Sequence, residues 1–381
     1  MRVLYGFTAP QSARAFLRGQ AKYMGQNGFE IHVISAPGPE LDELSKTADV
    51  QVHPVPMKRE ISIWDDMVGL LQWILVVRRV RPHVVNVGTP KAALLGMLAA
   101  RLLRVPVRIY VVRGLRYEGL EGSRRKILIV IEKLICAWST EVVVVSQSVG
   151  AAMREAGIPR SEMKLIGAGS SNGVDVARWR DAVTGADKAK LAMDLAIPEG
   201  DLIALFVGRV SRDKGISMLM DMLRHARTIQ LRVTLVVVGR IEDEELADEL
   251  ARFSDSVRMV GYRDDVEVFY SLCDVLLLPT RREGFPNVVL EAAAAGTPAI
   301  TTDSTGAVDS VIDGVTGFVV PYGDGAAMAE RIKRIVEDPE GFKEMSVSAL
   351  SRAENAFYPE RVWSGLRSIY LSVPDRDVSS V

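Results

Sequence analysis

The chain has 381 residues, of which 48% are hydrophobic and 25% are charged, and its formal net charge is −1. This length favours two domains over one, and the composition is typical of a soluble globular enzyme rather than of a disordered or fibrous chain. The two cysteines, Cys136 and Cys273, lie far apart in apolar runs without metal or redox spacing, so we expect a reducing cytoplasm as the compartment.

Membrane-spanning segments are not expected. The longest apolar stretches, Met67–Val77 and Ile127–Trp138, are shorter than the about 20 residues that cross a bilayer. The start, MRVLYGF, is typical of a buried strand, and we expect no signal peptide. Residues 1–175 hold 23 of the 47 Lys+Arg and 15 of the 48 Asp+Glu, a net of +8 against −9 for the remainder. A basic half suits an anionic partner such as lipid headgroups, a pyrophosphate or nucleic acid.

Short apolar runs predict β-strands along the first half of the chain. These runs are Val3–Phe7, Phe29–Ser35, Gln51–Pro56, His83–Gly88, Val107–Val112 and Glu141–Ser146. Helical patterns separate them. The runs are apolar throughout rather than alternating, which is typical of parallel strands covered on both faces.

A polar stretch, Asn172–Gly200, interrupts this alternation, which then restarts. The later predicted strands are Leu202–Val210, Arg232–Gly239, Val257–Tyr262, Val275–Thr280, Pro298–Asp303 and Thr316–Pro321. The sequence therefore predicts an α/β fold of two doubly wound, Rossmann-like domains, over residues 1–175 and 176–356. We expect the last helix, in 357–381, to pack back on the first domain.

The first strand of the second half leads into a basic segment, Leu205–Ile216. Gly208 lets the backbone approach a ligand, and Arg209 and Lys214 bring two positive charges to the carboxyl end of the sheet, where open α/β sheets bind ligands. We expect Ser211 or Asp213 to cap a following helix. Surface cations after a strand are the alternative interpretation.

Two glutamates, Glu283 and Glu291, flank a loop and the start of an alanine-rich helix. Gly284–Val288 is expected to form a helix N-terminus, whose free N–H groups bind anions without a metal. The carboxylates of Glu283 and Glu291 can lie on one side of this helix N-terminus, where they can accept hydrogen bonds from sugar hydroxyls. The alternative is that both glutamates only complement the helix dipole.

These two segments, together with Ser171–Asp175, resemble the retaining glycosyltransferases of family 4, whose GT-B fold has two Rossmann-like domains facing each other across a cleft. The Glu–seven residues–Glu motif of that family matches Glu283 and Glu291. The resemblance implies that Glu283 faces the donor sugar and that Glu291 holds the ribose hydroxyls. It also implies that Arg209 and Lys214 hold the donor diphosphate, and it makes these two cations and Glu283 the candidate catalytic residues.

The resemblance further implies a set of donor contacts. They are Gly208, the backbone of Gly284, Phe285, Pro286, Asn287 and Val288, and Tyr262 in the base-binding segment Gly261–Arg263. A nucleotide sugar, with UDP preferred, is then a substrate rather than a cofactor, and no metal or other cofactor is expected. Attack on the same face of the sugar as the departing phosphate is the preferred mechanism.

Asn86–Gly119 resembles the subset of the family that builds capsule, O-antigen and other lipid-linked glycans. This resemblance implies a glycan acceptor that is either linked to a lipid pyrophosphate or part of a polysaccharide. It also implies no nucleic-acid partner and peripheral contact with the inner face of the cytoplasmic membrane. Candidate acceptor-binding residues are Lys91, Arg113, Arg116, Ser12 and Arg14. The chain departs from many members at Asn86, Gly88 and Arg113, where those members carry histidines.

Three other functions are compatible with two such domains. A sugar-nucleotide epimerase would need acid–base groups that the sequence does not show. A dehydrogenase would need G-x-G-x-x-G after the first strand, where the chain has YGFTAPQSA. A noncatalytic nucleotide-sugar-binding protein would not need the complete donor set.

Overall fold

The structure, a computed structural model, describes residues 1–47, 50–58, 62–158, 162–180 and 185–372. The chain divides into two compact units. Unit 1 comprises Met1–Asn172 and Pro359–Val381, and unit 2 comprises Gly173–Tyr358. The domain boundaries predicted from the sequence lie between residues 175 and 176 and between residues 356 and 357.

Within the described residues, unit 1 is built on a seven-stranded parallel sheet of order β3-β2-β1-β4-β5-β6-β7. The strands are β1 (Arg2–Gly6), β2 (Glu30–Ser35), β3 (Val50–Pro54), β4 (Val84–Val87), β5 (Val107–Val112), β6 (Glu141–Val144) and β7 (Lys164–Leu165). The order reverses between β1 and β4, so the loops after these two strands diverge at the carboxyl edge, which is the place where doubly wound folds form a crevice.

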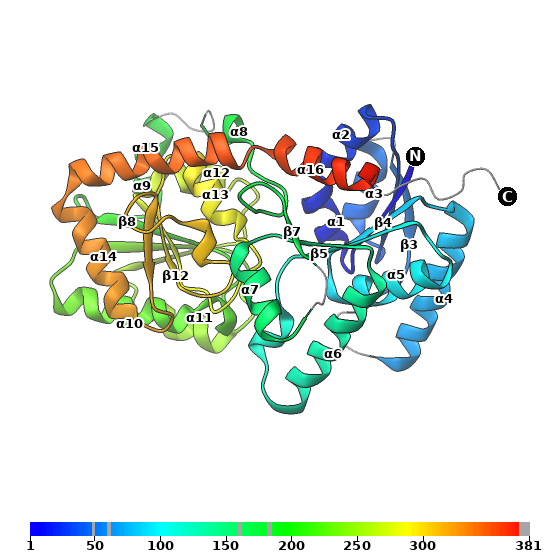
Figure 1. The fold of residues 1–381 in the computed structure, drawn as a ribbon. Helices are drawn as coiled ribbons and strands as arrows, with labels where there is room; N and C mark the ends of the chain where they lie inside the picture. Colours follow the sequence, from blue (N-terminus) through cyan, green and yellow to red (C-terminus); the bar gives the residue numbers. More distant parts are fainter. Residues whose placement is uncertain (48–49, 59–61, 159–161, 181–184, 373–381) are drawn as a thin grey trace. The chain divides into compact units, whose positions relative to one another are not determined.

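The helices of unit 1 cover the two faces of this sheet (Figure 1). They are α1 (Pro10–Leu17), α2 (Gln20–Gln26), α3 (Pro39–Thr47), α4 (Ile63–Val80), α5 (Pro90–Leu102), η1 (Arg116–Gly119), α6 (Gly122–Trp138), α7 (Gln147–Glu155) and α16 (Pro359–Ser372). One layer contains α4, α5 and α6 in that order, since α4 and α6 both pack against α5. The other contains α1, α2 and α3, with α16 packed on α2.

The core of unit 1 lies between the sheet and these layers. Trp73 of α4 is completely buried and its ring packs against the backbone of Gly6 in β1 and of Gly96 in α5. Val77 is buried one turn further along α4. This burial of a large aromatic side chain fixes which face of α4 meets the sheet.

Unit 2 holds, within its described residues, a six-stranded parallel sheet of order β10-β9-β8-β11-β12-β13. Its strands are β8 (Leu202–Val207), β9 (Val233–Val238), β10 (Val257–Gly261), β11 (Val275–Leu278), β12 (Ala299–Thr302) and β13 (Gly317–Val320). Its helices are α8 (Val176–Arg180), α9 (Gly185–Asp194), η2 (Arg212–Lys214), α10 (Ile216–Thr228), α11 (Glu244–Ala251), α12 (Glu267–Leu272), α13 (Asn287–Ala294), η3 (Val308–Ser310), α14 (Gly325–Glu337) and α15 (Pro339–Ala356). The order reverses between β8 and β11.

The predicted strands are all confirmed. Most are buried apolar runs that a parallel sheet covers on both faces, while the edge strands β3 and β10 are only partly buried. The short edge strand β7, Lys164–Leu165, was not predicted, since two half-buried residues carry no periodic signal. Among the described residues, no helix is long and apolar enough to cross a membrane.

Candidate active site

The two segments predicted to bind a ligand meet at the point where the strand order of unit 2 reverses. β8 pairs directly with β11, with Ala204 opposite Val275 and Leu205 opposite Leu276. The loops that follow these strands therefore leave the sheet side by side. This is the edge at which open α/β sheets bind their ligands.

Lys214 and Glu283 form the centre of this site. The Lys214 ammonium pairs with Oε1 of Glu283, and the two side chains are 20% and 18% exposed. The Thr280 hydroxyl lies 3.5 Å from the same carboxylate oxygen. Both charged side chains are thus mostly buried, so water screens the two charges less than it would at an open surface.

Close backbone contacts fix the loops that carry this pair. Gly215 has φ 75°, and a Cβ there would lie 1.8 Å from the carbonyl oxygen of Pro279. Gly306 has φ 77°, and a Cβ would lie 2.4 Å from the carbonyl oxygens of Glu283 and Gly284. Both positions require glycine, because another residue would force the loops apart.

Asp213 lies beside three cations and was not recognised from the sequence as a site residue. Its carboxylate accepts a hydrogen bond from the Ser211 hydroxyl (2.7 Å) and pairs with Arg209 (3.4 Å) and Arg282 (3.6 Å). Partial burial raises the pKa of Asp213, but this hydrogen bond and the charges of Arg209, Lys214 and Arg282 outweigh it, so the pKa lies below its ordinary value. Asp213 therefore stays ionised and orders the cations around it.

The cap expected at Ser211 or Asp213 is found only in part, because Ser211 is the N-cap residue of the short 3₁₀ helix η2 but its side chain makes no capping hydrogen bond. The N-cap of α10 is Gly215, and no side chain caps that helix. The two polar residues instead belong to the short 3₁₀ turn and its entrance, and their side chains bind each other. Arg209 also pairs with Glu242, which follows β9.

The N-terminus of α13 is open at the same edge. Pro286 is its N-cap and provides no side-chain hydrogen bond, so the first amides of the helix are available to an anion. The Oδ1 atom of Asn287 is buried, and among the described residues no hydrogen-bond partner is found for it. Phe285 is buried beneath the loop, where its ring packs on Phe357 with centroids 5.2 Å apart.

Glu291 is positioned by a buried tyrosine that the sequence did not reveal. The Tyr270 hydroxyl of α12 donates a hydrogen bond to Oε2 of Glu291 (2.9 Å). Burial, and then the nearby Glu291 charge, raise the pKa of Tyr270 well above its ordinary value, so the hydroxyl keeps its proton and remains a donor. Trp179 packs its ring edge-on against Tyr270, with centroids 5.3 Å apart.

Tyr262 follows β10 at the same sheet edge, and its side chain is 56% exposed. The guanidinium of Arg240, from the loop after β9, lies 4.5 Å from the centre of its ring. Its hydroxyl donates to Asp264 (2.9 Å). The ring is thus held in place while one side of it stays open to solvent.

Arg113 is the most unusual of the candidate residues in unit 1. It follows β5, its guanidinium carbon lies 3.8 Å above the centre of the Phe16 ring, and one N–H reaches the carbonyl of Ser171 at 3.5 Å. Its Nε is buried, with no hydrogen-bond partner found among the described residues. Burial lowers the pKa of Arg113 to about 10, so the side chain is still charged at neutral pH. A partly buried cation without a carboxylate partner is costly unless an anion binds it.

The other candidate acceptor-binding residues in unit 1 differ from Arg113 in their contacts and exposure. Lys91, at the start of α5, pairs with Asp66 at 2.6 Å and its side chain is only 9% exposed. Arg14 pairs with Glu43 at 3.2 Å, and Arg116 is exposed. Ser12 lies in the first turn of α1. Asn86 donates a hydrogen bond to the Tyr370 hydroxyl (2.7 Å).

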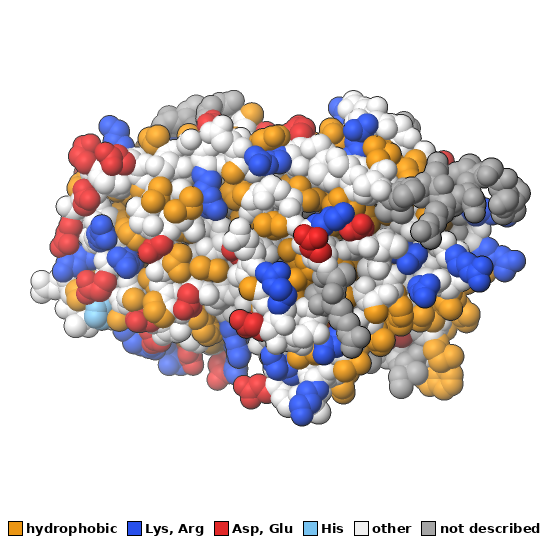
Figure 2. Space-filling model, viewed as in Figure 1, with side chains coloured by type: hydrophobic (Ala, Val, Ile, Leu, Met, Phe, Trp, Pro, Cys, Tyr) orange, Lys and Arg blue, Asp and Glu red, His pale blue; other side chains and the backbone are white. Residues whose placement is uncertain are grey.

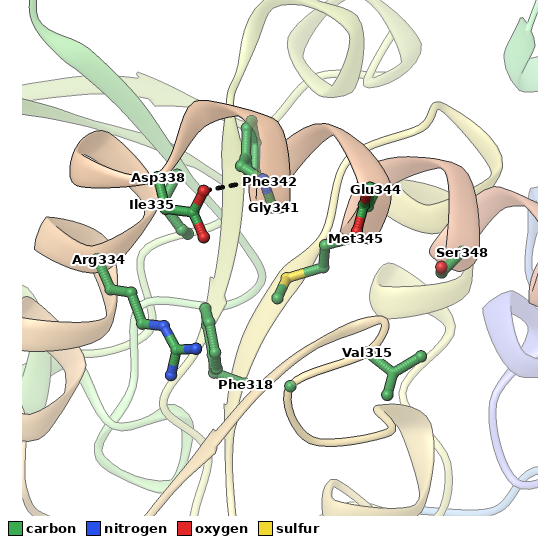
Figure 3. A pocket seen from close by; sticks show the side chains of 11 residues that line it. Val315, Phe318, Arg334, Ile335, Asp338, Gly341, Phe342, Glu344, Met345 and Ser348 are labelled. Carbon is green, nitrogen blue, oxygen red and sulfur yellow. Dashed lines mark hydrogen bonds between the residues drawn. The ribbon is translucent and has the colours of Figure 1, made fainter.

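A cavity of about 310 Å³ in unit 2 lies away from these residues (Figure 3). It is lined by α14, α15 and the loop before β13, including Val315, Phe318 and Arg334, at the amino end of that strand. The Asp338 carboxylate beside it accepts a hydrogen bond from the Gly341 amide (3.0 Å). Because the cavity holds none of the charged pairs described above, we place the candidate active site at the carboxyl edge instead.

Two family models match the chain. Residues 201–338 match the model described as glycosyl transferases group 1. Residues 13–169 match the model described as a glycosyl transferase 4-like domain. The first match contains every donor-site candidate.

Relatives match nearly the whole chain. The capsular polysaccharide biosynthesis glycosyltransferase CapM of Staphylococcus aureus is 33% identical over 360 residues, which cover 93% of each protein. The UDP-Gal:alpha-D-GlcNAc-diphosphoundecaprenol alpha-1,3-galactosyltransferase of Escherichia coli is 23% identical, over 91% of this chain and 89% of that protein.

Solved structures of other proteins share the fold of this chain. The crystal structure of HepE from Anabaena in complex with UDP-glucose superposes with a TM-score of 0.80 at 20% identity, over 97% of this chain and 98% of that one. At this identity the similarity establishes the fold. Together with the relatives and family models, it shows that the chain is a group 1, family 4 glycosyltransferase with the GT-B fold.

Proposed function

We propose that this enzyme transfers a sugar from a UDP-sugar, with retention of configuration, to a glycan acceptor linked to a lipid pyrophosphate, in the synthesis of a bacterial surface polysaccharide. Relatives named for capsule synthesis and for transfer from UDP-galactose to a diphosphoundecaprenol-linked sugar support this choice. Unit 2 is the proposed donor-binding unit and unit 1 the proposed acceptor-binding unit. The proposed site of the reaction in the cell is the inner face of the cytoplasmic membrane.

The observation that carries the proposal is the Lys214–Glu283 pair beside the open end of α13. A nucleotide diphosphate sugar has an anionic diphosphate next to a sugar rich in hydroxyls. Lys214, Arg209 and the first amides of α13 offer positive charge and N–H donors to the diphosphate. Glu283 offers a carboxylate to the sugar.

The groups that bind the diphosphate also explain how the sugar is transferred. Breaking the bond between the anomeric carbon and the phosphate oxygen moves an electron pair onto the diphosphate. Arg209, Lys214 and the α13 amides bind this group more strongly as its charge grows, so they stabilise the transition state more than the ground state. The departing phosphate oxygen then lies on the face from which the acceptor hydroxyl attacks, and it can take the proton of that hydroxyl.

Other groups bind without taking part in the chemistry. Glu291, oriented by Tyr270, is the proposed partner of the ribose hydroxyls. Tyr262, held against Arg240, offers an exposed ring beside the nucleotide base. In unit 1, Arg113 is a partly buried cation of the kind that an acceptor pyrophosphate would neutralise.

A panel of UDP-sugars, offered with and without a lipid-pyrophosphate-linked sugar, tests the proposal. We expect acceptor-dependent release of UDP, and an acceptor product heavier by one sugar in mass spectrometry. A change of the sugar configuration within the nucleotide sugar would instead indicate an epimerase. Binding of UDP-sugar with no product from any acceptor would indicate a noncatalytic binding protein.

A further inference from the structure

The loop after β9 brings a carboxylate to the cations of the candidate active site in unit 2. Glu242 follows β9, which ends at Val238, and its Oε2 atom pairs with Nη1 of Arg209. Glu242 is not among the site residues that the sequence predicted. An acidic side chain of the protein itself therefore binds part of the cation that we propose for the donor diphosphate.

Backbone contacts fix this loop against the loop after β8. The Val210 amide donates a hydrogen bond to the Arg240 carbonyl (2.9 Å), and the Val210 carbonyl accepts one from the Glu242 amide (3.1 Å). Gly239 has no room for a side chain, since a Cβ there would lie 1.8 Å from the carbonyl oxygen of Gly208. The main chain thus holds Glu242 beside the site, and the carboxylate can leave only by rotation of its side chain.

Two carboxylates share the Arg209 guanidinium. Glu242 pairs with Nη1, and Asp213 lies 3.4 Å from Nη2. Asp213 also accepts a hydrogen bond from the Ser211 hydroxyl (2.7 Å) and pairs with Arg282 (3.6 Å). Within the described residues, the Glu242 side chain has no hydrogen bond or ion pair except the one with Arg209. Asp213 is therefore the fixed partner of Arg209, and Glu242 is the exchangeable one.

The exposure of these side chains leads to the same distinction. Glu242 is 41% exposed, against 33% for Asp213 and 18% for Glu283, and Arg209 is 45% exposed. Figure 2 shows that acidic and basic side chains lie side by side along the lower edge of unit 2, over α10 and α11. Exposed ion pairs of this kind are weak, because water screens the charges and ordering two long side chains costs entropy. The contact between Glu242 and Arg209 can therefore open easily when another anion binds.

The ion pairs of the site match its cations with an equal number of carboxylates. The cations are Arg209, Lys214 and Arg282, and the carboxylates in contact with them are Asp213, Glu242 and Glu283. A diphosphate is strongly anionic and binds best where positive charge exceeds negative charge. Movement of one carboxylate away from its cation would create that excess. Glu242 is the carboxylate that can move without breaking a contact to a second cation.

We propose that Glu242 exchanges with the diphosphate on Arg209. The Glu242 side chain leaves Arg209 when the donor binds, because two anions on one guanidinium repel each other, and it returns when UDP leaves. By competing for the same N–H groups, Glu242 weakens the binding of UDP and speeds its release after transfer. The inference rests on the proposed function in taking Arg209 as a ligand of the diphosphate. Glu242 acts through Arg209 and contacts neither the sugar nor the reacting atoms.

Titration calorimetry of the full chain with inorganic pyrophosphate and with UDP tests this inference. Glu242→Gln keeps the size of the side chain and removes its charge. We expect this variant to bind both ligands about two- to fivefold more tightly than the wild type, which is the range expected for an exposed ion pair. In stopped-flow displacement, UDP should leave the variant more slowly by a similar factor, since affinity differences between related complexes lie mostly in the dissociation rate.

Two controls separate exchange on Arg209 from a general change of charge. Glu244→Gln removes an exposed carboxylate in the first turn of α11, which makes no ion pair within the described part of the chain, and this variant should bind as the wild type does. In an Arg209→Gln background, Glu242→Gln should have no further effect on pyrophosphate binding. The cation for which the two anions compete is then missing, so the two substitutions are not additive.

Several results would overturn the inference. Weaker binding by Glu242→Gln would show that Glu242 holds Arg209 in place for the ligand instead of competing with it. Unchanged binding, an equal gain in Glu244→Gln, the same gain in the Arg209→Gln background, or no binding of pyrophosphate and UDP by the wild type would also refute the exchange.

The proposed function can fail separately from this inference. Tighter pyrophosphate binding by Glu242→Gln, without UDP release from any donor, would support the exchange and refute the proposed function. Acceptor-dependent transfer from a UDP-sugar, with UDP affinity unchanged in Glu242→Gln, would support the proposed function and refute the exchange.

Discussion

At the scale of single residues, the Lys214–Glu283 pair is the clearest chemical feature of the molecule. Its two members are 69 positions apart, and each is about four-fifths buried. Each neutralises the charge of the other at the sheet edge. Under the proposed function, a diphosphate sugar would offer the ammonium an anion and the carboxylate hydroxyl donors, and the pair would bind both ends of that group.

We predict that Lys214→Ala and Glu283→Ala each lower kcat at least about tenfold, a loss of roughly 1.4 kcal/mol or more of transition-state stabilisation. Since the two side chains contact each other, the double variant should lose less than the product of the single losses. Steady-state kinetics of UDP release measures both effects. Lys343→Ala, which removes an exposed lysine of α15, is the control. Wild-type turnover in a folded Lys214→Ala protein would contradict the assigned role.

A second prediction concerns Glu132, a buried acid of α6. Its carboxylate accepts a hydrogen bond from the Tyr110 hydroxyl (2.8 Å), and burial raises the pKa of Glu132 from 4.5 to about 7. Between these values the folded protein holds a proton that the unfolded chain has released. The free energy of unfolding therefore falls as the pH rises from about 4.5 through about 7.

Glu132→Gln removes this titration and can still accept the hydrogen bond. Relative to the wild type, the variant should gain stability as the pH rises from 5 to 8, by up to about 3 kcal/mol at about 1.4 kcal/mol per pH unit. Urea unfolding at a series of pH values measures the difference. Glu121→Gln, an exposed neighbour at the start of α6, should show no such trend. A constant difference between Glu132→Gln and the wild type would contradict the prediction.

At the scale of elements, the last helix is joined to the first sheet by buried polar contacts. The Tyr370 hydroxyl of α16 accepts a hydrogen bond from Asn86 in β4 (2.7 Å) and donates one to the Tyr5 hydroxyl in β1 (3.2 Å). Trp363 of the same helix donates to Asn172 (2.8 Å) and packs on Tyr23. These contacts explain why a segment at the end of the chain belongs to unit 1.

We predict that Tyr370→Phe destabilises unit 1 by about 1–3 kcal/mol, because it leaves the buried Asn86 amide without its acceptor. The control Tyr358→Phe changes a tyrosine that is 42% exposed and should be nearly neutral. Urea unfolding, followed by the fluorescence of Trp73 and Trp363, measures the effect. Equal stability of the two variants would show that this polar network contributes little.

At the scale of the whole molecule, the charge and the candidate sites divide between the two units. All the candidate donor residues belong to unit 2, while the candidate acceptor residues belong to unit 1. The basic charge of the first half and the acidic charge of the second follow the same division. Under the proposed function, donor and acceptor would thus bind to separate units.

We therefore predict that UDP protects unit 2 selectively. Hydrogen exchange should slow in the segments 208–215 and 283–291, by a factor that corresponds to about 2.7 kcal/mol when UDP is at 100 times its Kd. The sheet of unit 1 should exchange as it does without UDP. Protection confined to unit 1 would contradict the placement of the donor site.

The sequence alone determined the alternating strands and helices, the parallel character of both sheets, and the family. The physical reason is that these depend on short apolar runs and on motifs that are local in the chain, such as the spacing of Glu283 and Glu291. Only the tertiary structure decided which side chains meet. Lys214 meets Glu283 because β8 lies next to β11. Glu291 meets Tyr270 because α13 packs against β11 and α12 packs against the neighbouring strand β8. No local pattern encodes such long-range neighbours, since strand order and burial depend on the whole chain.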